Sequence, residues 1–151
     1  MIIWLTGQPG SGKTTIAKEL ITSEGALCQW FHIDGDDIRE LFDNKDYSIS
    51  GRKKNVELAQ KLAQYLNSKG KKVVVSMVSP YREQRESFKE KMGSDIIEVF
   101  VHTMEKRGRE HFFVNDYEKP TDNFIDCDTT NVPVNLCAEL IIEYAKNSRR
   151  G

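Results

Sequence analysis

The chain has 151 residues, of which 38% are hydrophobic and 30% charged, and its formal net charge is −1. This length is typical of one domain with a full hydrophobic core, so we expect a single domain over residues 1–151. The near-neutral charge argues against a protein that binds nucleic acid, and no apolar run approaches the ~20 residues that a membrane-spanning helix needs.

A glycine-rich segment near the N-terminus stands between a predicted strand and a predicted helix. The strand covers residues 2–5, and the helix covers residues 15–20. The segment between them, residues 7–14, reads Gly-Gln-Pro-Gly-Ser-Gly-Lys-Thr and matches G-x-x-x-x-G-K-[ST] at every fixed position. In this setting the motif binds the phosphates of a nucleoside triphosphate. The alternative, a glycine turn without a ligand, is disfavoured because strand, loop and helix all agree.

The motif assigns a role to each part of the loop. Its glycines let backbone N–H groups point at phosphate oxygens, and the N-terminus of the helix adds partial positive charge. The Lys13 ammonium would reach the β- and γ-phosphates, and the Thr14 hydroxyl would hold Mg²⁺. The predicted ATP-binding residues of this loop are Gly7, Gln8, Pro9, Gly10, Ser11, Gly12, Lys13, Thr14 and Thr15.

Further predicted strands alternate with helices along the chain. The strands are residues 29–33, 73–76, 96–101 and 124–127, and most are rich in apolar or β-branched residues, as parallel strands covered on both faces are. Apolar residues recur at helical spacing over residues 55–66 and 134–145. This order predicts the three-layer α/β fold of P-loop NTPases, with a central, mostly parallel five-stranded sheet and ligand-binding loops at the carboxyl ends of the strands.

Acidic residues follow the second predicted strand. Asp34, Asp36 and Asp37 come directly after it, at the edge of the sheet that carries the phosphate loop. Phosphoryl transfer needs metal ligands and a group that orients or deprotonates the attacking hydroxyl, and a carboxylate can do either. The alternative is helix capping, which would explain Asp37 on its own. The third strand ends in Ser76 rather than in an acidic residue, so the prediction depends on Asp34 and Asp36.

Arginines mark the same predicted cleft. Arg39, Arg52 and Arg82 each fall in a predicted loop or near a helix start. Guanidinium groups bind phosphate or sulfate bidentately, so three of them around one cleft favour an anionic substrate.

Residues 104–123 break the alternating pattern. They mix charged and aromatic residues with Pro120 and show little periodicity. We expect a mobile lid near the ligand, and the alternative is an ordinary surface excursion.

The motifs together point to a known family. Beside the phosphate loop they are residues 33–39, Ile-Asp-Gly-Asp-Asp-Ile-Arg, Tyr47-Ser48 with Arg52 and Asn55, and residues 78–82, Val-Ser-Pro-Tyr-Arg. Weaker matches follow at 117–120 and 128–129. In these the chain resembles the adenylyl-sulfate kinase family, which phosphorylates the ribose 3′-hydroxyl of adenylyl sulfate with MgATP. The resemblance implies an ATP-dependent phosphotransferase with an alcohol acceptor, using ATP and Mg²⁺.

The resemblance also implies roles for particular residues. Asp36 would be the base or the carboxylate that binds metal-held water, with Asp34 in support, so the catalytic residues would be Asp36, Lys13 and Asp34 and the metal ligands Thr14 and Asp36. Arg39, Arg52 and Asn55 would hold the sulfate–phosphate end and ribose of the acceptor. Tyr47 stands where the family usually has Phe, and it would stack on the acceptor base. The implied substrate-binding residues are Asp34, Asp36, Arg39, Tyr47, Arg52, Asn55, Ser79, Pro80, Tyr81 and Arg82.

The predicted lid departs from the family. The usual stretch with K-G-L-Y is missing, and residues 107–113, Arg-Gly-Arg-Glu-His-Phe-Phe, stand in a much shorter segment. Lid residues of the family help to select the acceptor, so this departure bears on the acceptor more than on phosphoryl transfer. Another nucleotide derivative, such as the cytidine diphosphoramidate of capsule synthesis, is therefore the second candidate acceptor. Either Arg107 or Arg109 would meet the transferring phosphate, and the sequence does not choose between them.

Other functional classes stay open at this point. A nucleotide-binding module without turnover would not need both Asp34 and Asp36. A polynucleotide 5′-kinase would favour a basic groove, which the net charge of −1 does not support.

The remaining reactive residues suggest no further chemistry. Cys28, Cys127 and Cys137 form no CxxC or Cys/His cluster, so we expect reduced thiols in a cytoplasmic protein rather than a zinc site. His32 and His102 lie near strand ends, and we expect packed or hydrogen-bonded rings rather than catalytic ones. The sequence is compatible with a homodimer.

Overall fold

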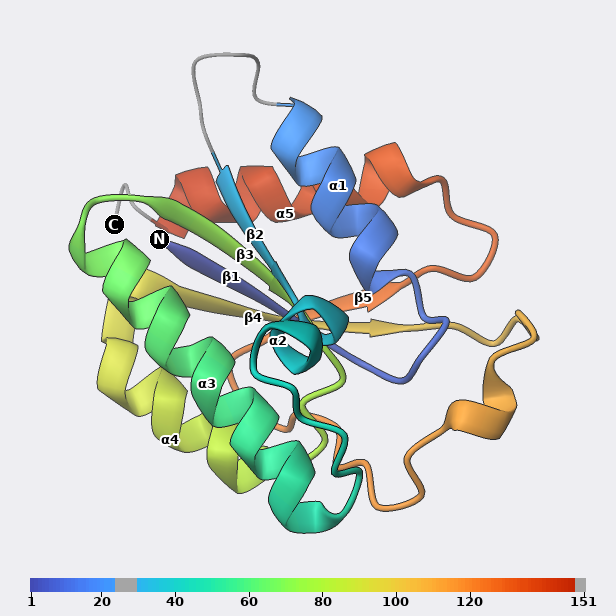
Figure 1. Ribbon diagram of the computed structural model, residues 1–151. Coiled ribbons are helices and arrows are strands. Elements are labelled where there is room, and N and C mark those ends of the chain that lie inside the picture. Colours follow the sequence, from blue (N-terminus) through green and yellow to red (C-terminus); the bar gives the residue numbers. More distant parts are fainter. Residues whose placement is uncertain (24–29, 149–151) are drawn as a thin grey trace.

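The computed structural model describes residues 1–23 and 30–148 (Figure 1). Within them the strands form one sheet in the order β2-β3-β1-β4-β5, and each neighbouring pair is parallel. The strands are β1 (Ile2–Thr6), β2 (Trp30–Asp34), β3 (Lys72–Ser76), β4 (Ile96–His102) and β5 (Ile125–Asp128). The predicted parallel sheet is confirmed. Strand β2 runs one residue further than predicted and includes Asp34, while its predicted start at Gln29 lies outside the described residues.

Helices cover both faces of the sheet and complete the predicted three layers. Helices α1 (Lys13–Ser23) and α5 (Val134–Ser148) pack on one face, and α3 (Ile49–Ser68) and α4 (Arg82–Met92) pack on the other (Figure 1). Neighbouring residues of a strand point to opposite faces, so Ile3 and Leu5 of β1 pack toward α1 and α5, while Ile2 and Trp4 pack toward α3 and α4. Because both faces are covered, every residue of β1 is buried.

The short helix α2 (Gly35–Leu41) starts immediately after β2. Asp36 and Asp37 lie in its first turn, and Asp34 occupies the capping position but makes no side-chain capping hydrogen bond. Capping by Asp37 is therefore wrong, because this residue lies inside the helix rather than before it. The three carboxylates gather at the carboxyl end of β2, as the sequence predicted.

Residues between β4 and β5 form the irregular segment that the sequence predicted. Their only regular element within the described residues is η2 (Glu110–Phe112), a single 3₁₀ turn, and a second such turn, η1 (Gly93–Asp95), precedes β4. The segment extends past the carboxyl ends of the strands, where it is drawn in orange in Figure 1.

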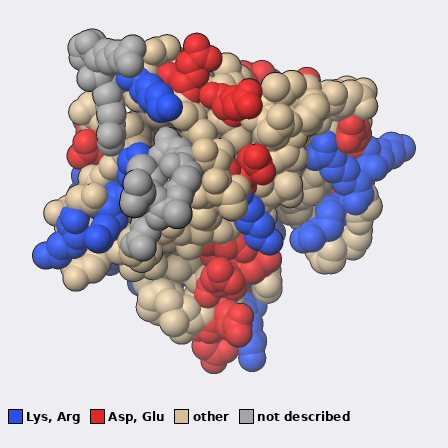
Figure 2. Space-filling view, turned by 90° about the horizontal axis from the view of Figure 1, so that it is seen from above, with Lys and Arg blue, Asp and Glu red and all other residues tan. Residues whose placement is uncertain are grey.

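Two observations bear on partners of the protein: the charges on one face and the character of the helices. On the face drawn in Figure 2, acidic side chains separate the basic ones. Among the described helices, none is both long and apolar enough to cross a bilayer.

Candidate functional site

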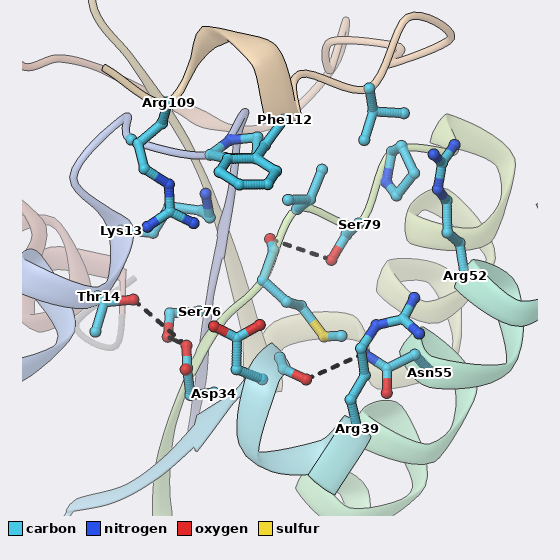
Figure 3. Close-up of a pocket in the computed structure, with 18 of the residues that line it drawn as sticks. Lys13, Thr14, Asp34, Arg39, Arg52, Asn55, Ser76, Ser79, Arg109 and Phe112 are labelled. Carbon is cyan, nitrogen blue, oxygen red and sulfur yellow. Dashed lines mark hydrogen bonds between the residues drawn. The ribbon is translucent and has the colours of Figure 1, made fainter. Parts of the chain in front are cut away.

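A cavity of about 640 Å³ opens at the carboxyl ends of β1, β2 and β3 (Figure 3). Its walls come from the phosphate loop, the start of α2, the segment after β3, one end of α3 and the segment after β4. The predicted site residues on its wall are Pro9, Gly10, Gly12, Lys13, Thr14, Thr15, Asp34, Asp36, Arg39, Tyr47, Arg52, Asn55, Ser79, Pro80, Arg107 and Arg109. The structure thus brings most of the predicted residues to one place.

Three residues of the phosphate loop lie off this wall. Gly7 passes so close to β4 that a Cβ atom would lie 2.1 Å from the carbonyl oxygen of Val101, and its φ of 154° suits glycine. The Gln8 side chain exchanges two hydrogen bonds with the backbone of Val114, at 2.8 and 2.9 Å. The Ser11 carbonyl accepts the Thr129 hydroxyl at 2.7 Å. Gly7, Gln8 and Ser11 therefore shape and anchor the loop rather than line the cavity.

Tyr81 and Arg82, which were also predicted to bind the substrate, are not among the residues that line the cavity. Tyr81 is buried immediately before α4, and Arg82 is the first residue of that helix. The Arg82 Nε donates to the carbonyl of Lys119 at 2.9 Å, so its guanidinium turns toward the end of the lid segment. Ser79 and Pro80, which precede these two residues, do line the cavity.

Lys13 is a nearly buried cation at the centre of the loop. The residue is only 8% exposed, and its Nζ donates to the Gln8 carbonyl at 2.9 Å and to Ser11 Oγ at 3.4 Å. Burial lowers the pKa of Lys13 from 10.5 to about 8; Asp34 opposes the shift, and Arg109 adds to it. An ammonium held this way, beside a second cation, favours the approach of an anion.

Two hydroxyl groups hold the carboxylate of Asp34. Ser76 Oγ donates to Asp34 Oδ1 at 2.9 Å, and Thr14 Oγ1 donates to the same oxygen at 3.4 Å (Figure 3). The serine that ends β3 thus bonds to the carboxylate that ends β2. Asp36, in the first turn of α2, is exposed and lines the cavity.

The oxygen atoms at this end of the cavity suit Mg²⁺. Thr14 and Asp36 offer the hard oxygen ligands that this ion prefers. Within the described residues, no group of three or more His, Cys, Asp or Glu side chains could hold a metal by itself. That arrangement fits an ion that takes few protein ligands and completes its shell with phosphate and water.

Arg39 and Tyr47 form one side of the far wall. The Arg39 guanidinium lies 4.0 Å from the centroid of the Tyr47 ring, and it donates to the carbonyls of Asn44 and Asp46 at 3.1 and 3.0 Å. Tyr47 is 65% exposed, so its other face is open to a ligand.

Arg52 and Asn55, both on α3, complete this wall. Arg52 Nη1 lies 3.4 Å from the Asp116 carboxylate, which ties α3 to the lid segment. Asn55 is 5% exposed, and its Nδ2 donates to the Gly35 carbonyl at 3.2 Å. Its buried Oδ1 has no hydrogen-bond partner, a costly state that a donor group on a ligand would relieve.

The two lid arginines differ in their surroundings. Arg107 donates to the carbonyls of Gly10, Ser11 and Thr129 and to the Glu105 carboxylate. Arg109 lies beside Lys13 and makes no hydrogen bond or ion pair with the described residues; its guanidinium is 5.2 Å from the Phe112 ring centroid (Figure 3). Arg107 is therefore already saturated by backbone acceptors, whereas the charge of Arg109 is available.

Sequence reasoning missed several residues of the cavity wall. Ser76, Phe112 and Val114 line it. Ser76 was noticed only as a hydroxyl in place of an acidic residue. The parallel register that sets Ser76 against Asp34 gives it a partner, and no local pattern reports that register.

The remaining histidines and cysteines are mostly as expected. His102 Nε2 lies 2.8 Å from Asp126, and burial lowers the pKa of His32, which bonds to Ser76. Cys127 and Cys137 are free and buried, and burial raises the pKa of Cys127 to about 12, so it is a poor nucleophile. Cys28 lies outside the described residues.

The model of the adenylylsulphate kinase family matches residues 1–126. The chain belongs to this family. Against an adenylyl-sulfate kinase of Pseudomonas aeruginosa it is 33% identical, over 98% of this chain and 86% of the relative. An adenylyl-sulfate kinase of Buchnera aphidicola is also 33% identical, over 68% of this chain, but only about half of that relative (52%) is covered.

A second kind of relative belongs to the same set of matches. A cytidine diphosphoramidate kinase of Campylobacter jejuni is 30% identical, over 84% of this chain and 77% of the relative. Among solved structures, the adenylyl-sulfate kinase of Mycobacterium tuberculosis in complex with AMPPNP and APS superposes with a TM-score of 0.80 at 23% identity, covering 96% of each chain. That likeness shows the shared fold.

The pKa of Lys13 predicts how phosphate binding depends on pH. A bound anion stabilises the ammonium and raises this pKa from its value of about 8, so binding takes up protons at about pH 8.5 and the affinity falls as the pH rises further. Calorimetry of a non-hydrolysable ATP analogue in two buffers of different ionisation enthalpy measures the uptake. Lys13→Arg is the matched control, because arginine stays protonated and should remove it. Equal proton uptake in both proteins would contradict the assignment to Lys13.

Proposed function

We propose that the protein is an ATP-dependent kinase that phosphorylates a hydroxyl of a nucleotide-like small molecule. The leading acceptor is the ribose 3′-hydroxyl of adenylyl sulfate. One observation carries the proposal: a complete phosphate loop and the carboxylates of Asp34 and Asp36 face the same cavity, whose far wall carries two guanidinium groups. Membership of the adenylylsulphate kinase family supports the reaction class.

The phosphate loop would hold ATP at one end of the cavity. Lys13 and the N-terminus of α1 offset the negative charge of the phosphates, and Arg109 supplies a further cation beside them. Thr14 and Asp36 would hold Mg²⁺, which neutralises charge on the phosphates when bound.

The acceptor hydroxyl would approach the transferring phosphoryl group from the side where Asp34 and Asp36 lie. Asp36 accepts or orients the proton of the attacking hydroxyl, and Asp34, fixed by Ser76 and Thr14, keeps a negative charge beside it. Catalysis then depends mainly on placement and electrostatics. The Arg39 and Arg52 guanidiniums suit the anionic part of the acceptor, and the open face of Tyr47 suits its base.

We infer that residues 104–123 form a lid over this cavity. Two of its arginines and Val114 lie on the cavity wall, and Gln8 and Arg107 link the segment to the phosphate loop. A lid connected to the loop in this way would sense whether phosphate is bound and exclude water from the reacting groups.

A cytidine diphosphoramidate is the second candidate acceptor. The Campylobacter jejuni relative matches over most of its own length, at an identity close to that of the adenylyl-sulfate kinases.

We expect ATP-dependent phosphorylation of adenylyl sulfate when both acceptors are offered separately and ADP release is followed. Faster turnover of the cytidine compound would identify the second candidate. No turnover with either, together with tight ATP binding, would favour a non-catalytic module.

Asp36→Asn should lower kcat by about 100-fold or more, since a general base contributes at least this much. Measured without Mg²⁺, the affinity for an ATP analogue should change by less than about threefold, because the loop contacts remain. Asp37→Asn is the matched control: it lies in the same helical turn but not on the cavity wall, and it should leave kcat unchanged. Wild-type kcat in Asp36→Asn would refute the role of Asp36.

Substitutions of Arg107 and Arg109 should have different effects on kcat, on the KM for ATP and on the melting temperature. Arg109→Gln removes an unpaired guanidinium beside Lys13 and should lower kcat by about 100-fold with an unchanged melting temperature. Arg107→Gln removes hydrogen bonds to loop carbonyls and should lower the melting temperature and raise the KM for ATP, with a smaller effect on kcat. The reverse order of effects on kcat would assign the phosphate contact to Arg107.

A further inference from the structure

His32, Ser76, Asp34 and Thr14 form a continuous chain of hydrogen bonds. His32 Nε2 lies 2.7 Å from Ser76 Oγ, which lies 2.9 Å from Asp34 Oδ1, and Thr14 Oγ1 reaches the same carboxylate oxygen at 3.4 Å. The first three belong to two paired strands, and the last lies in the first turn of α1, which follows the phosphate loop. The chain thus joins a histidine inside the sheet to the edge where the cavity opens.

The sheet geometry explains why one hydroxyl meets both side chains. His32 and Asp34 are two residues apart in β2, so they point to the same face of the sheet. Asp34 pairs with Ser76 in the parallel register, and Ser76 is 1% exposed. Water therefore cannot easily replace either partner of the Ser76 hydroxyl, and its two hydrogen bonds are fixed by protein atoms.

The direction of the chain depends on the histidine. A serine hydroxyl carries one proton, whereas an ionised carboxylate only accepts hydrogen bonds. Ser76 can donate to Asp34 while its oxygen accepts from His32, which requires a proton on His32 Nε2. If Nε2 lacked this proton, the Ser76 hydroxyl would donate to the ring instead, and Asp34 would lose its closest donor.

We propose that His32 is a positioning residue, which orients the Ser76 hydroxyl and thereby holds the carboxylate of Asp34 in place for phosphoryl transfer. Its catalytic consequence rests on the proposed kinase function, whereas the hydrogen-bond direction can be tested without turnover. Asp34 needs such support because its carboxylate is only partly buried and makes no capping bond with α2. Groups that orient a site residue in this way commonly contribute about tenfold to activity or more.

The first test reads the position of the proton. Nitrogen NMR of the histidine rings at about pH 8 distinguishes the two neutral tautomers, and the signals of His32 are identified by their loss in His32→Gln. We expect His32 to carry its proton on Nε2. A ring protonated only on Nδ1 would overturn the proposal, whatever reaction the protein catalyses.

The second test compares paired variants in the kinase assay. His32→Leu removes the donor and should lower kcat about tenfold with little change in the KM for ATP, while His32→Gln, which keeps an N–H group at similar reach, should restore most of the activity. Ser76→Ala should lose as much as His32→Leu, Ser76→Thr should keep the activity, and the double variant His32→Leu/Ser76→Ala should lose no more than Ser76→Ala alone. Additive losses, or equal activity of His32→Leu and wild type, would overturn the proposal.

The matched control is His102→Gln. His102 is also a strand histidine with a hydrogen-bonded Nε2, but its partner, the Asp126 carboxylate, is not on the cavity wall. Its kcat should equal that of wild type. Thermal denaturation would show whether His32→Leu fails to fold. In that case the Ser76 variants and the tautomer of His32 test whether His32 orients the Ser76 hydroxyl. A wild-type protein that turns over no acceptor would refute the kinase function, while the tautomer would still test the hydrogen-bond chain.

Discussion

The parallel pairing of β2 with β3 and of β3 with β1 is the constraint on which the site depends. It brings the carboxyl ends of the three strands to one edge, and with them the phosphate loop, Asp34 and Ser76. The apolar character of β1, buried on both faces, fixes this strand at the centre of the sheet. A shift of β2 by one residue would turn Asp34 to the other face and bring Ile33 to the cavity, so the packing of apolar residues in β2 helps to fix the position of a polar group.

Burial determines how much the positive charge of Lys13 costs at the edge of the sheet where the cavity opens. Lys13 is drawn into the loop by the carbonyl of Gln8, and the partial loss of water makes its positive charge costly in the absence of an anion. Arg109 adds to that cost, while Asp34 and Asp36 reduce it. The region therefore contains two kinds of group. Its cations can bind an anionic phosphate, and its carboxylates can bind a hydroxyl or a metal ion. Phosphoryl transfer needs both kinds of group at a short separation.

The segment between β4 and β5 is short for a lid but extensively bonded. It contacts the phosphate loop through Gln8 and Arg107, α3 through Arg52, and the start of α4 through Glu118. Beneath it, the buried pair of Arg85 and Glu98 is joined to the carbonyl of Glu118. These contacts link the segment to the phosphate loop and to the face of the sheet that α3 and α4 cover.

Local patterns were sufficient for the architecture because they report local physics. The apolar strands, the helical spacing over residues 55–66 and 134–145, and the glycine-rich turn between β1 and α1 identified the strands, three of the helices (α1, α3 and α5) and their order, but not α2 and α4. They missed element ends, such as Asp34 within β2 and the start of α3 at Ile49, since ends depend on capping and tertiary contacts.

The sequence by itself determined that the chain has a phosphate loop, a parallel sheet and acidic residues after the second strand, since these are properties of short segments. Only the tertiary structure decided which side chains face the cavity. It left Tyr81 and Arg82 off the cavity wall and joined His32 to Asp34 through Ser76. It also occupied Arg107 with backbone carbonyls, whereas Arg109 makes no ion pair with the residues that the structure describes. These outcomes depend on the register of paired strands and on the orientation of helices, and both are set by contacts between residues far apart in the chain.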